Sequence, residues 1–223
     1  MDANFCPQCG QEDVELQRPL FELLGEVLRE TFDIDGRAAR TIWTMFSQPG
    51  VLTARFLAGH RKEYMSPVRL YLVVSVLFFL VVAWVVRQGI LFDVGADAAG
   101  EIRVLAEDLP TLMFIFLPVF ALLLKVAFRQ RFYFDHLIHA LHLHTAAYVA
   151  LALLLPLERA ANQHWLLLIV QLALFAYLAG HLAISFRRVY GATWVATAIK
   201  VTAILFGYTA ILATSLEFAG SLK

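Results

Sequence analysis

The chain has 223 residues, of which 60% are hydrophobic and only 16% are charged. Soluble domains contain about 45–50% apolar and about 25% charged residues, so this composition excludes an ordinary soluble domain and predicts a protein surrounded by lipid. The formal net charge is zero, which argues against nucleic acid as a partner.

Residues 1–17 form a short tail whose main feature is the cysteine pair Cys6 and Cys9. In the sequence CPQCGQ, two intervening residues and a glycine turn allow both thiolates to grip one tetrahedral zinc ion. A structural zinc site has four ligands, so this CxxC knuckle needs a second chain or a histidine to complete it. The alternatives are a redox pair and a metal-free remnant. The tail has no apolar stretch of the signal-peptide type, so we expect insertion through internal spans.

Residues 18–66 are predicted to form an amphipathic helical arm. From Leu20 to Phe32, apolar residues recur at helical spacing while acidic residues and an arginine occupy the other face. Two shorter segments, ARTIWTMF and VLTARFL, follow, with Pro-Gly and Gly-His pairs between the segments. We expect helices that lie in the cytoplasmic interface or dock under a membrane bundle. A small soluble helical cap is the alternative.

The rest of the chain, residues 67–223, is predicted to be an all-α polytopic membrane helix bundle with about five transmembrane helices. A spanning helix needs about 20 apolar residues to cross about 30 Å of hydrocarbon. Pro118 is expected to kink the second span, and Trp84 and Trp165 lie near span ends, as interfacial aromatic residues do. The predicted spans are residues 68–86, 109–128, 136–155, 165–186 and 194–216.

Basic residues near the span ends predict the orientation of the bundle. Lys125, Arg129 and Arg131 lie between spans 2 and 3, and Arg187 and Arg188 lie between spans 4 and 5. The loop after the first span is instead mainly acidic. Because short cytoplasmic loops are enriched in Lys and Arg, we expect a cytoplasmic amino terminus and an outside carboxyl terminus in an inner (cytoplasmic) membrane.

Span 3 opens with the histidine-rich stretch FDHLIHALHLHTAAY. His136, His139 and His142 are three residues apart, so at about 100° per residue they share one helix face with Asp135. Span 4 runs antiparallel, which places His181 at a similar depth. If the two spans pack as a hairpin, these residues converge at the cytoplasmic side. Neutral imidazoles with an orienting carboxylate suit zinc or another divalent transition metal.

The same histidines also allow two interpretations without metal. They can hydrogen-bond between helices or to the headgroup layer, or they can line a pocket that binds a ligand or handles protons. Tyr177 and Ser185 flank His181 on the same helix face. Lys200, inside span 5, can extend to the interface or face such a ligand.

The cytoplasmic edge of span 1 is crowded with basic side chains, in the sequence GHRKEYMSPVRLY. His60, Arg61, Lys62 and Arg69 suit the binding of anionic lipid headgroups. The alternative is that they act as ordinary orientation signals.

Several stretches resemble a bacterial integral membrane family catalogued only as domain of unknown function 3667. The resemblance rests on CPQCGQ, on TIWTMFSQPG and FLAGHRKEYMSPVRLYL in the arm, on FDHLIHALHLHTAAY and on FRRVYG. It covers nearly the whole chain and implies the same membrane architecture. Some members have a second CxxC upstream, which this chain lacks. The family implies no established activity.

These features favour a non-enzymatic multi-pass membrane protein that binds or organises lipids or partner proteins. Its expected site is a histidine-lined pocket at the cytoplasmic side of spans 3 and 4. The alternative is a metal-binding protein, serving metal transport or membrane enzymology. Membrane lipids are the expected partners, with a homodimer as an option.

Overall fold

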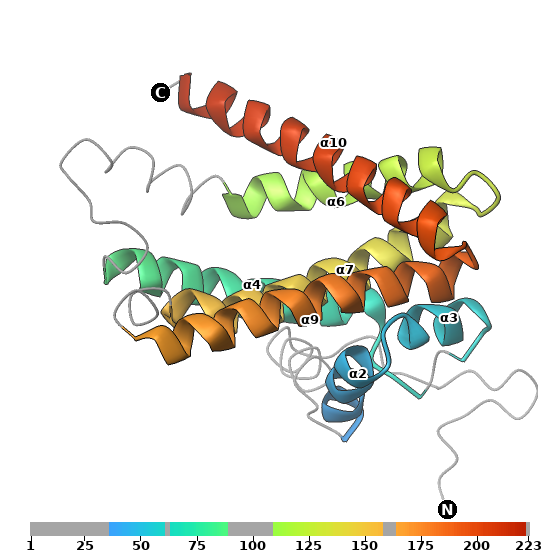
Figure 1. Ribbon diagram of the computed structural model, residues 1–223, viewed down its shortest axis with the longest axis horizontal. Helices are drawn as coiled ribbons and strands as arrows, with labels where there is room; N and C mark the ends of the chain where they lie inside the picture. Colours follow the sequence, from blue (N-terminus) through green and yellow to red (C-terminus); the bar gives the residue numbers. More distant parts are fainter. Residues whose placement is uncertain (1–35, 61–62, 89–108, 158–163, 222–223) are drawn as a thin grey trace, which may run out of the picture. The chain divides into compact units, whose positions relative to one another are not determined.

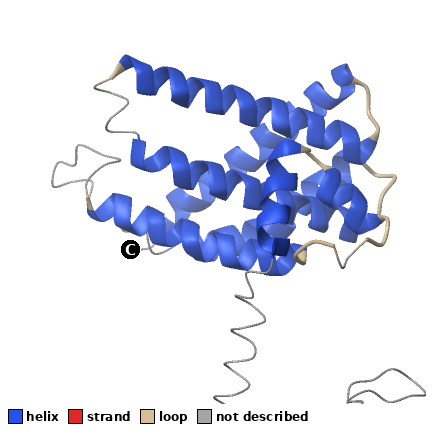
Figure 2. Cartoon of the chain, turned by 90° about the horizontal axis from the view of Figure 1, so that it is seen from below, coloured by secondary structure: helices blue, strands red, loops and turns tan. Residues whose placement is uncertain are grey.

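The computed structural model describes residues 36–60, 63–88, 109–157 and 164–221, and the regular structure in these ranges is entirely helical (Figure 1). Figure 2 draws these helices in blue. The CxxC knuckle and the first part of the arm lie outside the described residues. The helices are α2 (Gly36–Ser47), α3 (Val51–Leu57), α4 (Pro67–Arg87), α6 (Leu109–Ala127), α7 (Tyr133–Leu154), the 3-10 turn η3 (Leu155–Leu157), α9 (Trp165–Tyr190) and α10 (Trp194–Ser221).

Five helices, α4, α6, α7, α9 and α10, are long and apolar enough to cross a membrane. This confirms the predicted number of candidate spans. The bounds differ most at α10, which continues five residues further than predicted. α9 continues four residues further, through Arg187 and Arg188, and α7 begins three residues earlier. Hydropathy marks the apolar part of a helix, whereas backbone hydrogen bonds continue into the polar residues beside it. α6 continues through Pro118.

Local sequence explains where several helices begin and end. Pro67 occupies the first turn of α4, where its missing N–H costs no hydrogen bond. The preceding Ser66 accepts a hydrogen bond from the backbone N–H of Arg69 at 3.3 Å. α9 ends at Gly191, whose φ of 67° lies in the left-handed region that glycine adopts most easily.

α7 is the central helix of the unit formed by residues 36–223. It packs against α4, α6 and α9, and also against both short helices, α2 and α3. More than half of its span window, 56%, is buried, against 6% for α9. Small residues such as Ala140 and Ala150 allow its neighbours to approach closely.

The outer helices present apolar side chains to their surroundings. On α9, large exposed side chains include Leu166, Ile169 and Phe175, and on α10 they include Ile199 and Phe206. A contiguous apolar surface of this extent is unusual for a soluble protein. A helix bundle embedded in lipid requires an apolar outer surface of this kind.

α2 and α3 pack on α7 and α9 next to the beginning of α4. The backbone N–H of Met65 donates to the Thr41 hydroxyl at 3.0 Å, which ties α2 to the segment before α4.

Tyr148 of α7 stacks on Phe78 of α4 with ring centroids 4.6 Å apart. Tyr148 lies fifteen residues after the start of α7, and Phe78 lies eleven residues after the start of α4. Because the two stacked rings lie at the same level, α7 extends about 6 Å further than α4 at this end, at 1.5 Å per residue. The short helices cover this step.

Candidate functional site

The histidine cluster comprises His136, His139 and His142 of α7 and His181 of α9. All four side chains are buried, and His136 and His139 are fully inaccessible. Their spacing on α7 directs the first three toward the side on which α9 and α3 pack. His136 and His139 both contact Tyr190, while His142 and His181 line one small void together with Ser185, which contacts His139. The structure therefore brings the four predicted histidines together.

His139 lies at the centre of this cluster between two hydroxyl groups of α9. Its Nε2 is 2.9 Å from the Ser185 Oγ and its Nδ1 is 3.2 Å from the Tyr190 Oη. A neutral imidazole has one donor and one acceptor nitrogen, and a hydroxyl can serve either of them. The two hydroxyls thus satisfy both polar atoms of a fully buried ring.

The Tyr190 hydroxyl also contacts the next histidine toward the helix end. The His136 Nδ1 is 2.9 Å from it, so Tyr190 bridges two imidazoles. The His136 Nε2 is buried and has no hydrogen-bond partner among the described residues. The Tyr190 ring stacks on Phe128, with centroids 3.9 Å apart. α7, α9 and the loop after α6 therefore meet at Tyr190.

The other two histidines connect the bundle to α2 and α3. The Thr53 hydroxyl of α3 is 2.9 Å from the His142 Nδ1. The His181 Nε2 donates to the Met45 carbonyl of α2 at 2.8 Å. One histidine of α7 and one of α9 thus hold the short helices by hydrogen bonds, in addition to apolar packing.

The turn between α2 and α3 approaches α9 so closely that it requires glycine. Gly50 has a φ of 77°, and a Cβ built on it would lie 2.9 Å from the Ser185 carbonyl oxygen. Tyr177 donates to the Phe46 carbonyl and Arg188 to the Pro49 carbonyl, both at 2.5 Å. Every turn of the polar half of α9 therefore contacts this segment.

These hydrogen bonds bear on the predicted metal site at Asp135, His136, His139, His142 and His181. Among the described residues, no group of three or more His, Cys, Asp or Glu side chains is placed to hold a metal ion. The nearest partner of the Asp135 carboxylate is the Arg131 guanidinium, at 3.9 Å. Both His139 nitrogens are engaged by hydroxyls. The geometry matches hydrogen bonding between helices better than metal coordination.

The fourth histidine of the stretch, His144, points to a different neighbour. Its Nδ1 donates to the Ala140 carbonyl at 2.9 Å, and its Nε2 is 3.0 Å from the Tyr208 Oη of α10. Because Nδ1 carries the proton in this neutral ring, Nε2 accepts a hydrogen bond from the Tyr208 hydroxyl. α7 therefore carries polar contacts to α9 on one side and to α10 on another.

A partly open pocket of about 340 Å³, called the central cavity below, lies among α6, α7, α9 and α10. Its wall is largely apolar, with Met113, Phe120 and Leu212 among the lining residues. The polar side chains in the wall are His144, Tyr148, His181 and Tyr208. His181 and Leu143 also line a much smaller void beside Gly50 and Thr53, so His181 is the member of the histidine cluster that also borders the central cavity.

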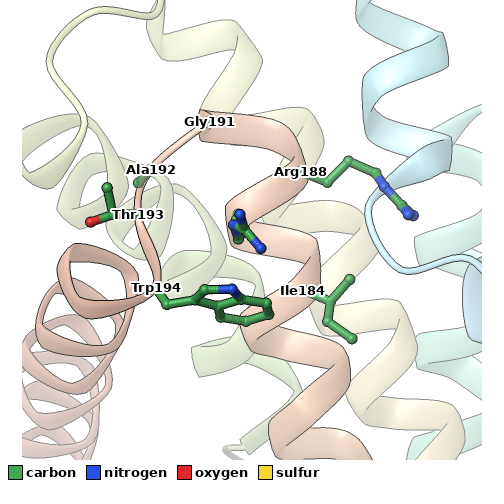
Figure 3. A pocket seen from close by; sticks show the side chains of 7 residues that line it. Ile184, Arg188, Gly191, Ala192, Thr193 and Trp194 are labelled. Carbon is green, nitrogen blue, oxygen red and sulfur yellow. The ribbon is translucent and has the colours of Figure 1, made fainter.

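A second pocket, of about 570 Å³, surrounds the turn between α9 and α10 (Figure 3). The Arg187 guanidinium lies over the Trp194 ring, 4.4 Å from its centroid. Arg188 extends away from Trp194 in Figure 3, toward the Pro49 carbonyl that it contacts. Both arginines of this turn are therefore engaged within the protein.

Several predicted site residues lie outside the described residues or apart from the cluster. Cys6, Cys9, Arg61 and Lys62 fall in ranges that the structure does not describe. The zinc knuckle and the four-residue headgroup site accordingly stay predictions. Lys200 does not face the histidines, because its Nζ donates to the Ala127 carbonyl at 2.9 Å.

Sequence reasoning named the histidines but missed most of their partners. Thr53, Tyr190 and Tyr208 come from segments distant in the chain, and Gly50 was recognised only as a break between helices. Ser185 was placed on the correct face of α9 through its spacing from His181. One sequence feature could have indicated Tyr190, namely the stretch FRRVYG at the polar end of a span.

The comparisons with known proteins assign no activity to the chain. No curated protein and no solved structure matches the chain. The segment containing α2, α3 and the first half of α4 carries Met45, Gly50 and Thr53, which contact the α7 and α9 side chains. This segment, residues 35–79, matches the model of the family described as "Protein of unknown function (DUF3667)", which confirms the predicted resemblance within this segment.

Proposed function

We propose that this is a multi-pass membrane protein that binds a membrane-soluble ligand in the central cavity. The observation that carries the proposal is the cavity itself, about 340 Å³ of largely apolar space among four candidate spans. Ligand sites have volumes of about 300–1,000 Å³ and combine apolar walls with a few placed polar groups. The proposed role is binding rather than catalysis.

The polar groups in the cavity wall favour a ligand that carries a hydroxyl. The Tyr208 hydroxyl donates to His144, so its oxygen retains lone pairs that can accept a hydrogen bond. His181 donates through Nε2 to a carbonyl, so its Nδ1 is an acceptor. Two acceptors in an apolar cavity complement a donor on an otherwise apolar molecule. A long-chain alcohol or a lipid with a free hydroxyl has this chemistry.

We also propose that the end of the bundle carrying α2 and α3 faces the cytoplasm of an inner membrane. Arg129, Arg131, Arg187 and Arg188 lie in the two turns at this end, and short cytoplasmic loops are enriched in such residues. Five spans then place the amino terminus inside and the carboxyl terminus outside. This orientation puts the histidine cluster on the cytoplasmic side.

The test uses photoactivatable hexadecanol and purified full-length protein in detergent. We expect labelled peptides from α7 and α10, and we expect excess unlabelled hexadecanol to reduce the labelling. Ala147 lines the cavity and its small side chain is accessible. Ala147→Trp should therefore fill the cavity and reduce labelling at least tenfold, since it removes most of the ligand's apolar contact.

The matched control is Ala173→Trp, at an exposed position of α9 that is not part of the cavity wall. It adds the same side chain and should leave labelling unchanged. Thermal unfolding of both variants checks that each is folded. Equal labelling of Ala147→Trp and the unmodified protein would contradict the proposal.

A further inference from the structure

A basic pocket of about 790 Å³ lies at the same end of the bundle as the histidine cluster and is separate from the central cavity. It is formed by the end of α6, the loop to α7, the end of α9 and one residue of α10. Its charged side chains are Arg129, Arg131, Asp135 and Lys200. Three cations against one carboxylate give the pocket a net positive charge.

Three carbonyl groups at this place already accept hydrogen bonds from lysines, which reduces their repulsion of an anion. The Lys200 Nζ donates to the Ala127 carbonyl at 2.9 Å. The Lys125 Nζ donates to the carbonyls of Arg129 and Arg131 at 2.8 and 2.5 Å. These two ammonium groups also offset the partial negative charge at the end of α6. What remains available in the pocket is mainly positive charge and N–H groups.

The two arginines of the loop have donors to spare. Within the part of the chain that the structure describes, the Arg129 guanidinium forms no hydrogen bond or ion pair. Among the described side chains, the Arg131 guanidinium pairs with the Asp135 carboxylate alone, at the long distance of 3.9 Å. A guanidinium offers five N–H donors in a planar fork that matches phosphate oxygens. The pocket thus holds donors without strong internal partners.

The beginning of α7 adds to the positive potential. Its N-cap residue, Phe132, has no side-chain oxygen to accept from the first-turn amides. An uncapped helix N-terminus carries partial positive charge and free N–H groups. Asp135, in the first turn, offsets part of this charge. Phe132 is also 81% exposed, so an apolar side chain lies directly beside the cations.

We propose that the basic pocket binds the phosphate of an anionic phospholipid. The cations and amides match the phosphate, and Val126, Phe128 and Phe132 provide apolar contact for the adjoining glycerol and acyl chains. The pocket lies where two candidate spans end and two begin, which is the level of lipid headgroups. The Tyr190 ring connects the pocket to the cluster, because its hydroxyl contacts His136 and His139.

The test is native mass spectrometry of the full-length protein in a neutral detergent. Samples are incubated with dioleoyl phosphatidylglycerol, with dioleoyl phosphatidylcholine or with inorganic phosphate. We expect a retained phosphatidylglycerol adduct, little phosphatidylcholine, and no competition by phosphate at millimolar concentration. A basic residue near the membrane surface contributes about 1 kcal/mol to binding of anionic lipid. Arg129→Gln should therefore weaken phosphatidylglycerol binding about 5-fold, and Arg129→Gln with Arg131→Gln about 30-fold.

The matched control is Arg87→Gln, which removes the same charge. Arg87 is the last residue of α4 and is not part of the basic pocket, so binding should be unchanged. Thermal unfolding without lipid checks that the variants fold. Unchanged binding in folded Arg129→Gln and the double variant would overturn the proposal, as would equal loss in Arg87→Gln. Displacement of the lipid by inorganic phosphate would show an anion site without lipid selectivity, and equal binding of phosphatidylcholine would show no headgroup site. Each of these results would also overturn the assignment.

Discussion

His139 illustrates how a polar side chain is accommodated at a fully buried position of this bundle. Both of its ring nitrogens lie within 3.2 Å of a hydroxyl oxygen, one from Ser185 and one from Tyr190. Hydroxyl groups rotate to donate or accept, so the pair serves either neutral tautomer of the ring. A buried imidazole without such partners would cost about 1–3 kcal/mol.

Gly50 gives the sharpest prediction at the residue scale. Gly50→Ala places a Cβ on a residue with a φ of 77° and 2.9 Å from the Ser185 carbonyl oxygen. We expect a loss of about 2–4 kcal/mol in the free energy of unfolding, because backbone strain of about 1–2 kcal/mol adds to the clash. Thermal unfolding in detergent measures this loss.

Gly191→Ala is the matched control for Gly50→Ala. Gly191 has a similar φ of 67°, but no atom lies within 4 Å of its added Cβ. It should show the backbone cost alone, about 1–2 kcal/mol. Equal losses in the two variants would mean that the close approach of Gly50 to Ser185 does not contribute.

At the element scale, α9 is held to α7 and α2 mainly through its polar side chains. Only 6% of the α9 span window is buried, yet Tyr177, His181, Ser185 and Tyr190 all form hydrogen bonds to other elements. Lipid chains solvate apolar helix surfaces as well as another helix does, so polar contacts and close packing decide which helices associate.

A double-mutant cycle on His139 and Ser185 tests this view of the α7–α9 contact. The losses in unfolding free energy for His139→Ala and Ser185→Ala should not add, because both remove the same hydrogen bond. We expect a coupling energy of about 1 kcal/mol, within the range for contacting residues. Thermal unfolding of the two single variants and the double variant gives this value.

Ser75→Ala supplies the control cycle with His139→Ala. Ser75 is equally buried, but its hydroxyl donates to the Leu72 carbonyl of its own helix. The two losses should therefore add within about 0.5 kcal/mol. Additivity in both cycles would show that the 2.9 Å contact between His139 and Ser185 has no energetic role.

At the scale of the whole molecule, the number of spans determines which ends face the same side. One candidate span, α6, separates Gln88, just after α4, from Gln130, in the loop before α7. We predict that Gln130→Cys reacts with a membrane-impermeant maleimide only from the cytoplasmic side and Gln88→Cys only from the other side. Both are made in a Cys6→Ser, Cys9→Ser background and assayed in intact cells and inverted vesicles. Labelling of both from one side would show that α6 does not cross.

The sequence predicted the membrane bundle well because its signals are local. Each span is a continuous apolar stretch whose length can be compared directly with the bilayer. The docked α2 and α3 were predicted only as one of two alternatives, since an amphipathic helix has the same pattern whether it contacts lipid, water or another helix. The structure shows that both short helices pack on the bundle, through contacts to His142 and His181.

The sequence by itself determined that the chain is helical, that five segments can cross a membrane, and that three histidines share a face of α7. Hydropathy and the helical repeat act over a few turns, so one segment suffices to predict each of these. Only the tertiary structure decided that Ser185, Tyr190 and Thr53 would satisfy those histidines, and that cavities would form beside His144 and Arg129. Such contacts depend on the rotation and offset of one helix against another, which arise from the packing of all the helices together and have no local pattern in the chain.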